Sequence, residues 1–311
     1  MKNISSALEL GATMYIPATH EQLWQVTQGQ KYPELKSVVV CLEDSVHAQD
    51  VAFALNNLKI LFQRIQQEST NQDIAVFVRP RDLSMAQESV SWQFNTCFQG
   101  FIVPKFVLKD LEAWRDCVTA HRHVMLTMES HEYFDMGYVA DLKSALLTNF
   151  NKEILCLRIG GNDLLSCLNL RRSKDCTIYD TPIGLLIPQL VGHFVPAGFQ
   201  LSSPVFEHYS NTPLLKKELA LDKVNGLLTK TAIHPSQLNI IHDAYKVNSI
   251  DYYEAQMIMD ANAKSVFKSN GSMLEPATHR NWAQHILTRA QIYGVIESHL
   301  QFAEHPSKLV I

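Results

Sequence analysis

The stretch SVVVCLED, residues 37–44, joins an apolar run to a charged end. The residues from Val38 to Leu42 are apolar enough to be buried on both faces, which is typical of a strand in a parallel sheet. Glu43 and Asp44 follow directly. Two carboxylates at the end of a buried strand indicate either a polar site at that edge of the sheet or caps for the helix that follows.

Seven further runs of this kind alternate with longer segments of helical character. The segment 45–69 is one such helix, because its apolar residues recur at helical spacing. Eight strands, each followed by a crossover, within about 235 residues predict an α/β fold of the (β/α)8 TIM barrel type. The eight runs are ATMYIP (12–17), SVVVCLED (37–44), IAVFVRP (74–80), GFIVPK (100–105), HVMLTMES (123–130), EILCLRIGG (153–161), FQLSSPVFE (199–207) and GLLTKTAIHP (226–235).

The remainder of the chain reads as helices rather than as strand–helix units. We therefore predict two parts, a (β/α)8 barrel catalytic domain over residues 1–245 and a C-terminal helical extension over residues 246–311. Helices appended to a complete barrel need an apolar surface to cover, and another subunit can supply one. We expect a homo-oligomer, with packing of the tail against its own barrel as the alternative.

Composition and charge narrow the class of protein. The 311 residues are 46% hydrophobic and 19% charged, as in a globular protein. A formal net charge of −4, with 27 scattered basic residues, gives no footprint for nucleic acid or a membrane surface, so we expect neither as a partner. The N-terminus lacks the pattern of a secretory signal and the six cysteines form no CxxC pair, which together predict a cytoplasmic location.

Charged residues end most of the predicted strands. In a (β/α)8 barrel the active site lies at the C-terminal ends of the strands, so these residues would share one mouth. A mouth rich in carboxylates, with lysine and arginine, suits a divalent cation and a carboxylic acid substrate. The candidates are Glu43, Asp44, Arg79, Lys105, Glu129, Asp163 after the Gly160–Gly161 turn, and Lys230.

Each candidate also has a purely structural interpretation. The carboxylates could cap helices, Arg79 could pair with Asp82, and Lys105 and Lys230 could be solvated. A shared position at one end of the barrel favours a site, because unrelated charges would be spread over both ends.

These residues lie in segments that resemble the HpcH/HpaI aldolase and citrate lyase β-subunit family over almost the whole chain. CLEDSV (41–46) is similar to the family's DLEDAV, RIGGNDL (158–164) to its FGxEDL, and GLLTKTAIHPSQ (226–237) to its GFxGKxAIHPxQ. The sequence most resembles the divergent branch associated with bacterial tellurite-resistance and stress gene clusters. Further matching segments, in the family's order, are MYIPAT (14–19), FVRPR (77–81), IVPK (102–105) and TMES (127–130).

The resemblance implies a lyase that cleaves or forms carbon–carbon bonds of carboxylic acids, often as coenzyme A thioesters, with Mg²⁺ or alternatively Mn²⁺. The expected substrate is a small-molecule 2-oxo or 3-hydroxy acid, or its thioester, that reacts through a metal-stabilised enolate. By matching positions, Glu129 and Asp163 would bind the metal and Arg79 would hold the substrate carboxylate. Glu43 and Asp44 fall where the family keeps acids beside the water molecules bound to the metal.

The same comparison extends the set of candidates. Lys105 and Glu275 join the catalytic residues, and Gly160, Gly161 and Lys230 join the substrate contacts. No residue is uniquely marked as the base, for which Glu43, Asp44 and Glu275 are the candidates. The resemblance also favours a trimer, in which Glu275 would lie near the metal site of another chain.

Four positions depart from the family pattern and leave the use of coenzyme A open. Gly11–Ala12 stands where the family has an Arg–Ser pair, and Asn162 and Thr229 replace an acid and a glycine. Glu275 replaces an aspartate that some members use in thioester hydrolysis. Two alternative functions follow: an acyl-CoA thioester hydrolase at the same site, and a non-catalytic ligand-binding regulator with the same fold.

Overall fold

The chain folds as two compact units, Met1–Ala244 and Tyr245–Ile311. A computed structural model describes residues 4–68, 73–92, 97–119, 123–150 and 154–297. The first unit holds the alternating strands and helices, and the second holds the helices of the tail.

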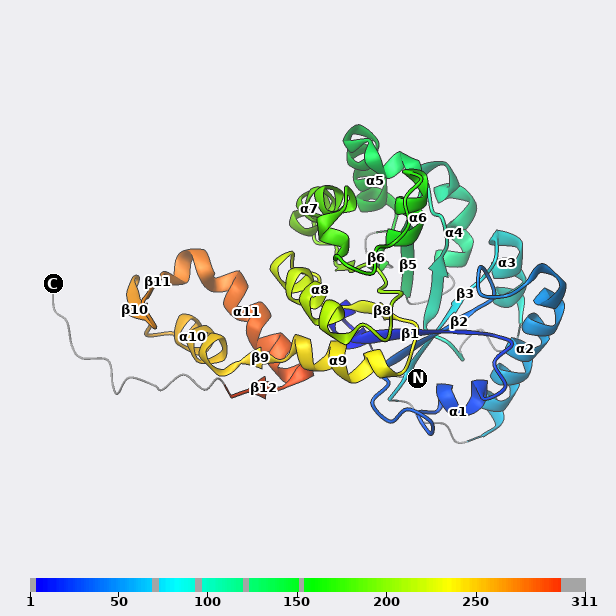
Figure 1. Cartoon of the computed structure of the whole chain (residues 1–311), viewed down its shortest axis with the longest axis horizontal. Coiled ribbons are helices and arrows are strands. Elements are labelled where there is room, and N and C mark those ends of the chain that lie inside the picture. Colours follow the sequence, from blue (N-terminus) through cyan, green and yellow to red (C-terminus); the bar gives the residue numbers. More distant parts are fainter. Residues whose placement is uncertain (1–3, 69–72, 93–96, 120–122, 151–153, 298–311) are drawn as a thin grey trace. The chain divides into compact units, whose positions relative to one another are not determined.

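The strands of the first unit form one parallel sheet that curls into a barrel. Within the described residues the sheet has eight strands in the order β7-β6-β5-β4-β3-β2-β1-β8, and a bridge between Ser203 and Lys230 brings its two ends together. Figure 1 shows the neighbouring strands β1, β2 and β3 and, beyond them, β5 and β6. The predicted (β/α)8 barrel is therefore confirmed. The strands are β1 (Ala12–Pro17), β2 (Ser37–Cys41), β3 (Ala75–Arg79), β4 (Gly100–Val103), β5 (His123–Met128), β6 (Ile154–Ile159), β7 (Leu201–Ser202) and β8 (Lys230–Ala232).

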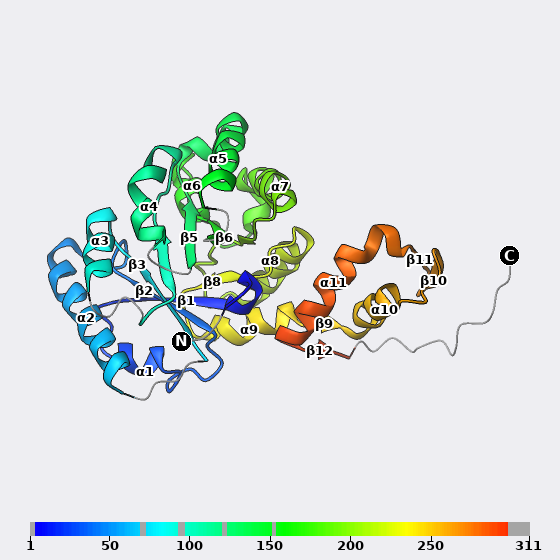
Figure 2. The ribbon, with the colours of Figure 1, turned by 180° about the vertical axis from the view of Figure 1, so that it is seen from behind.

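Helices connect successive strands and lie on the outside of the sheet, as Figure 2 shows from behind. The longest crossover of the barrel, α2, covers Val51–Gln67 and falls inside the predicted segment 45–69. Its buried residues, including Leu58 and Phe62, recur at helical spacing and face the sheet. The others are α1 (Leu23–Thr27), α3 (Leu83–Ser91), α4 (Leu111–Thr119), α5 (Met136–Asn149), α6 (Gly161–Cys167), α7 (Ile183–Phe194), α8 (Thr212–Val224) and α9 (Ser236–Tyr245).

The interior of the barrel is packed with side chains from the inner faces of the strands. Every residue of β2 is buried, because one face meets this interior and the other meets the helices. Val39, Phe77 and Met125 belong to the inner cluster. Ile4 and Leu10 pack against the same cluster, so the N-terminal segment covers the end of the barrel where the strands begin. Polar residues therefore gather at the other end of the barrel, where the strands end.

The second unit is built around two helices, α10 (Ser249–Met259) and α11 (Pro276–Tyr293). They bury a shared apolar cluster that includes Ile258 and Ile286. A hairpin of β10 (Phe267–Ser269) and β11 (Ser272–Leu274) joins the helices, and β9 (Val247–Asn248) pairs with β12 (Val295–Ile296). The described residues of this unit thus combine two helices with short strands.

In the part of the chain that the structure covers, every helix is too short or too polar to span a bilayer.

Candidate active site at the carboxyl ends of the strands

The carboxyl ends of β2 to β6 bring charged side chains together at the mouth of the barrel. Glu43 and Asp44 follow β2, Arg79 ends β3 and Lys105 follows β4. Glu129 follows β5, and its carboxylate pairs with Arg79 at the end of β3. The parallel order of the sheet places these strand ends side by side, which is why residues far apart in sequence become neighbours.

Arg79 is the centre of this cluster. Its Nη2 lies 2.9 Å from Glu43 Oε2 and 3.1 Å from Glu129 Oε1, and 3.8 Å from Asp44 Oδ2. Glu43 and Glu129 are both buried, so these ion pairs are screened little by solvent. Asp82 instead caps α3 by accepting from Met85 N, so the alternative of an Arg79–Asp82 pair is not what the fold uses.

Lys105 closes the cluster from the other side. Its backbone N–H donates to Glu129 Oε1 at 2.7 Å, and its Nζ donates to Glu43 at 2.8 Å and to Asp44 at 3.3 Å. The residue has φ 47°, a left-handed conformation that is uncommon for a side chain of this size. The strained turn aims both donors of one residue at the carboxylates.

Glu43 and Asp44 both reach the ammonium group of Lys105. β2 ends at Cys41, so strand alternation no longer controls the two carboxylates. The Glu43 side chain is 6% exposed and the Asp44 side chain 61% exposed. Asp44 is therefore the carboxylate of this pair that solvent and a substrate can reach.

The environments of Glu129 and Asp163 make both carboxyl groups hard to ionise. Burial raises the pKa of Glu129 to about 7, and the nearby Asp163 charge adds to the effect although Arg79 opposes it. Burial also raises the pKa of Asp163, and the charge of Asp44 adds to it. Like charges held close together in a partly buried mouth would be relieved by a cation.

Two glycines at the start of α6 shape the space around Glu129. A Cβ atom on Gly160 would lie 2.3 Å from Glu129 Cβ and 2.6 Å from its Oε2. Gly160 therefore allows Glu129 to lie against the backbone beside the turn that carries Asp163. Gly161 is buried against Ile178 and Pro204, where a side chain would clash.

The donor set suits Mg²⁺ better than a metal that needs a full cage of side chains. Among the described residues, no three histidine, cysteine, aspartate or glutamate side chains are grouped as metal ligands. Mg²⁺ is normally bound through one or two carboxylates and keeps several water molecules. Oε2 of Glu129, which lies beside Gly160, together with Asp163 fits that requirement.

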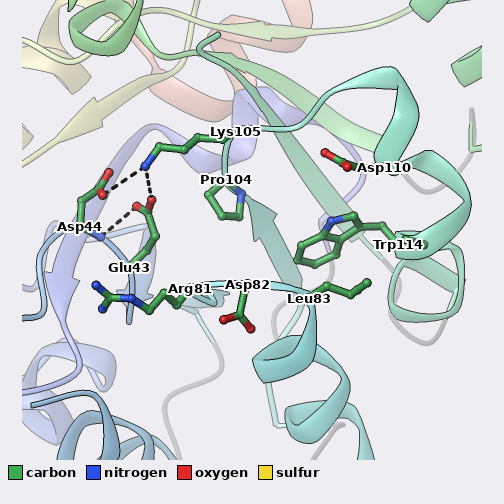
Figure 3. A pocket seen from close by; sticks show the side chains of 10 residues that line it. Glu43, Asp44, Arg81, Asp82, Leu83, Pro104, Lys105, Asp110 and Trp114 are labelled. Carbon is green, nitrogen blue, oxygen red and sulfur yellow. Dashed lines mark hydrogen bonds and ion pairs between the residues drawn. The ribbon is translucent and has the colours of Figure 1, made fainter. Parts of the chain in front are cut away.

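A cavity of about 490 Å³ opens beside the cluster. Figure 3 shows Lys105 reaching toward Glu43 and Asp44 on one wall, with Trp114 and Leu83 on the other. The side with Trp114 and Leu83 also carries the carboxylates of Asp82 and Asp110, so the lining of the cavity combines apolar and charged side chains.

Lys230 does not join the other candidates. It is the first residue of β8 and fully buried, with Nζ 3.0 Å from Glu218 Oε1 and 2.9 Å from Asp222 Oδ2 of α8. Its ammonium group is thus occupied between the sheet and a helix, and we leave it out of the proposed site. Glu275 lies in the second unit, directly before α11.

The departures from the family pattern have local structural reasons. Gly11 has φ 61°, which favours glycine, and a Cβ there would lie 2.7 Å from His242 Nε2. Thr229 Oγ1 donates to Gly11 O at 2.8 Å, so these two departures are in contact. Asn162 Nδ2 donates to Glu207 Oε2 at 2.9 Å, which places a carboxylate beside the turn that carries Asp163.

Glu207 and Arg158 were not among the candidates. The run 199–207 ends in Glu207 just as the run 37–44 ends in two acids, so the strand-end rule could have found it. Arg158 lies inside β6 and gives no comparable signal.

The fold is a TIM barrel, and its charged side chains gather at the carboxyl ends of the strands, where enzymes of this fold have their active sites. The chain belongs to the family of carbon–carbon bond lyases of the TIM-barrel fold, whose model matches residues 4–295. The predicted carbon–carbon lyase class is thereby confirmed.

Solved structures with the same fold include several citrate lyase relatives. A citrate lyase from Burkholderia xenovorans has a TM-score of 0.70 and 14% identity, and the match covers 95% of this chain and 96% of that one. CitE from Mycobacterium tuberculosis, in complex with magnesium, acetoacetate and coenzyme A, has a TM-score of 0.64 and 16% identity over 92% and 99% of the two chains. RipC from Yersinia pestis has a TM-score of 0.56 and 16% identity over 77% and 96%. A search of curated protein sequences finds no significant match.

Proposed function

We propose that this protein is a Mg²⁺-dependent lyase that cleaves or forms a carbon–carbon bond in a 2-oxo or 3-hydroxy acid, or in its thioester. The observation that carries the proposal is the Glu129 carboxylate. One of its oxygens is held by Arg79 and the Lys105 backbone, and the other lies against Gly160 beside the turn that carries Asp163. The magnesium and carboxylic acids bound by CitE support the same choice of cofactor and substrate class.

Glu129 and Asp163 would hold the metal, with Mn²⁺ as an alternative. When bound, Mg²⁺ supplies a Lewis acid that stabilises negative charge developing on a substrate oxygen. Glu43, between Arg79 and Lys105, keeps both cations in fixed positions at the mouth. Arg79 Nε, buried and without a partner among the described residues, is a donor that a substrate carboxylate can use.

Asp44 is the base that we favour among the three candidates. Its side chain is largely exposed at the cavity wall, whereas Glu43 is buried between two cations. A base must reach the proton that it removes, and Asp44 can do so without breaking a buried ion pair. Glu275 would take part only if another chain supplied it.

Incubation of the purified protein with Mg²⁺ and a panel of hydroxy acids and their coenzyme A thioesters tests the proposal. Release of pyruvate, glyoxylate or acetate that depends on Mg²⁺ is the expected result. Release of free coenzyme A without a new carbonyl product would indicate the thioester hydrolase instead. Binding without any turnover would indicate the non-catalytic regulator.

We also propose a homo-oligomer, with a trimer favoured, and a cytoplasmic location. Val266 and Met273 of the second unit are exposed apolar residues, and contact with another subunit would cover such side chains. All six cysteines are free, which suits a reducing compartment.

A further inference from the structure

Arg158 is a buried cation whose neighbours supply no negative charge. It is 2% exposed and lies in β6. Its Nη2 donates to Thr231 Oγ1 at 2.6 Å, its Nη1 donates to Met125 Sδ at 3.4 Å, and its guanidinium lies 5.5 Å from the centre of the Tyr15 ring. In the part of the chain that the structure describes, no carboxylate lies within ion-pairing distance of this guanidinium.

A buried guanidinium without a counter-charge is costly, because arginine stays protonated and loses its hydration. The other buried arginine of the barrel differs in this respect, since Arg172 contacts the Glu218 carboxylate. Tyr15 does not neutralise Arg158, because burial raises the pKa of the phenol although Arg158 opposes the shift. An anionic ligand would supply the counter-charge that the Arg158 guanidinium lacks.

Two further buried donors at this end of the barrel lack partners among the described residues. Thr127 Oγ1 is buried without a hydrogen bond, and Thr127 and Arg158 are direct neighbours in the β5–β6 register. Thr127 lies two residues before Glu129, on the same side of the strand. Arg79 Nε is the second orphan donor, and it belongs to the charged mouth itself.

Tyr15 links Arg158 to that mouth. Its ring lies beside the Arg158 guanidinium, and its hydroxyl is close enough to Arg79 and Glu129 for their charges to act on its pKa. A path of donors therefore runs from the metal-binding candidates inward to Arg158.

We propose that Arg158, Thr127 and Tyr15 form a second anion-binding subsite inside the mouth, which takes the far carboxylate of a dicarboxylic substrate. Charge-assisted hydrogen bonds from a guanidinium and two hydroxyl groups are well suited to a carboxylate. The substrate class is then a dicarboxylic 2-oxo or hydroxy acid whose other end lies at Glu129 and Asp163. This inference rests on the proposed function, since it names the substrate class of the same site.

Calorimetric titration with matched pairs of acids in the presence of Mg²⁺ tests the subsite. 2-Oxoglutarate is compared with 2-oxopentanoate, and oxaloacetate with 2-oxobutanoate, so that each pair differs only in the far carboxylate. At least one dicarboxylate is expected to bind about ten-fold or more tightly than its partner. Arg158→Met should remove that preference and leave monocarboxylate binding unchanged, and Arg158→Lys should keep part of it.

Thermal unfolding separates a ligand-binding role from a structural one. Arg158→Met removes an uncompensated buried charge, so the midpoint without ligand should stay the same or rise. Arg172→Met is the matched control. It leaves Glu218 with one cation fewer, so it should lower the midpoint and keep the preference for dicarboxylates.

Equal affinity within both pairs of acids, or a preference that survives in Arg158→Met, would overturn the subsite. If the monocarboxylates bind with Mg²⁺ but no preference is seen, only this inference fails. If Mg²⁺ does not bind but a preference exists and depends on Arg158, the proposed metal chemistry fails and the subsite stands.

Discussion

Arg79 contacts two buried carboxylates through one nitrogen and keeps its Nε without a partner among the described residues. Arg79→Lys keeps the charge but loses the planar fork, so it cannot hold Glu43, Glu129 and a substrate together. We expect kcat/KM to fall about 100-fold or more, because small misplacements of a positioning group have effects of this size. Steady-state kinetics measure it.

Arg64→Lys provides the control for this substitution. Arg64 pairs with Glu68 on the surface of α2, and kinetics should not change there. If Arg79→Lys were as active as the parent protein, Arg79 would have no role in substrate binding.

The raised pKa of Glu129 predicts that metal binding depends on pH. A carboxyl group with a pKa of about 7 is mostly protonated below that pH, and metal ligands must be deprotonated. Mg²⁺ affinity should therefore fall by about ten-fold for each pH unit below 7, and more steeply because the Asp163 pKa is raised as well. Calorimetric titration between pH 5.5 and about 8 follows this change.

Glu129→Gln and Asp163→Asn complete that experiment. Each should abolish Mg²⁺ binding at every pH while circular dichroism shows an intact fold. In the metal-free parent, the raised Glu129 pKa means that stability falls as pH rises from the ordinary carboxyl value through about 7, and Glu129→Gln should remove this fall. Metal binding as tight as in the parent by both variants would contradict the assignment.

At the scale of elements, the turn between β6 and α6 depends on Gly160. A methyl group there would overlap Glu129 Cβ and Oε2, so either the turn or the carboxylate must move. We expect Gly160→Ala to weaken Mg²⁺ binding at least about ten-fold, because metal sites require close ligand placement. Gly192→Ala in α7 is the control. Open space surrounds that position, and the substitution should stabilise the helix by about 0.5–1 kcal/mol without changing metal binding.

The contact between β8 and α8 depends on Lys230. Lys230→Met would leave Glu218 and Asp222 buried with one cation fewer, which should destabilise the fold by about 3–5 kcal/mol in urea unfolding. Lys217→Met removes an exposed lysine of α8 and should have little effect on the free energy of unfolding. A loss of substrate affinity in Lys230→Met with unchanged stability would return Lys230 to the list of substrate contacts.

At the scale of the whole molecule, the homo-oligomer is the main expectation. Light scattering on the full chain should give the mass of a trimer, and a chain that ends at Ala244 should be smaller, since the second unit supplies the proposed interface. A monomeric full chain removes this prediction, and an oligomer that survives the truncation moves the interface to the barrel.

The barrel was predictable because buried parallel strands read as continuous apolar runs, and eight of them are present. The rule that active sites lie at strand ends then selected Glu43, Arg79 and Glu129, which the structure brings into contact. Lys230 is the first residue of β8, which the run 226–235 could not show, and its role as a substrate contact stays a prediction.

Arg158 escaped prediction for a different physical reason. Both faces of β6 are buried, so the sequence does not show which side chains point into the barrel and which meet the helices. A charge within such a run can only be placed once the register with β5 is known.

The buried ion pairs of Lys230 also affect the order in which the molecule can assemble. The pairing of β1 with β8 joins distant parts of the chain, since the hydrogen bond from Thr229 to Gly11 spans 218 positions. Glu218 and Asp222 lie only 12 and 8 positions before Lys230. Both acids are therefore synthesised before the lysine, so the contact of β8 with α8 can form locally before β1 and β8 pair and close the barrel.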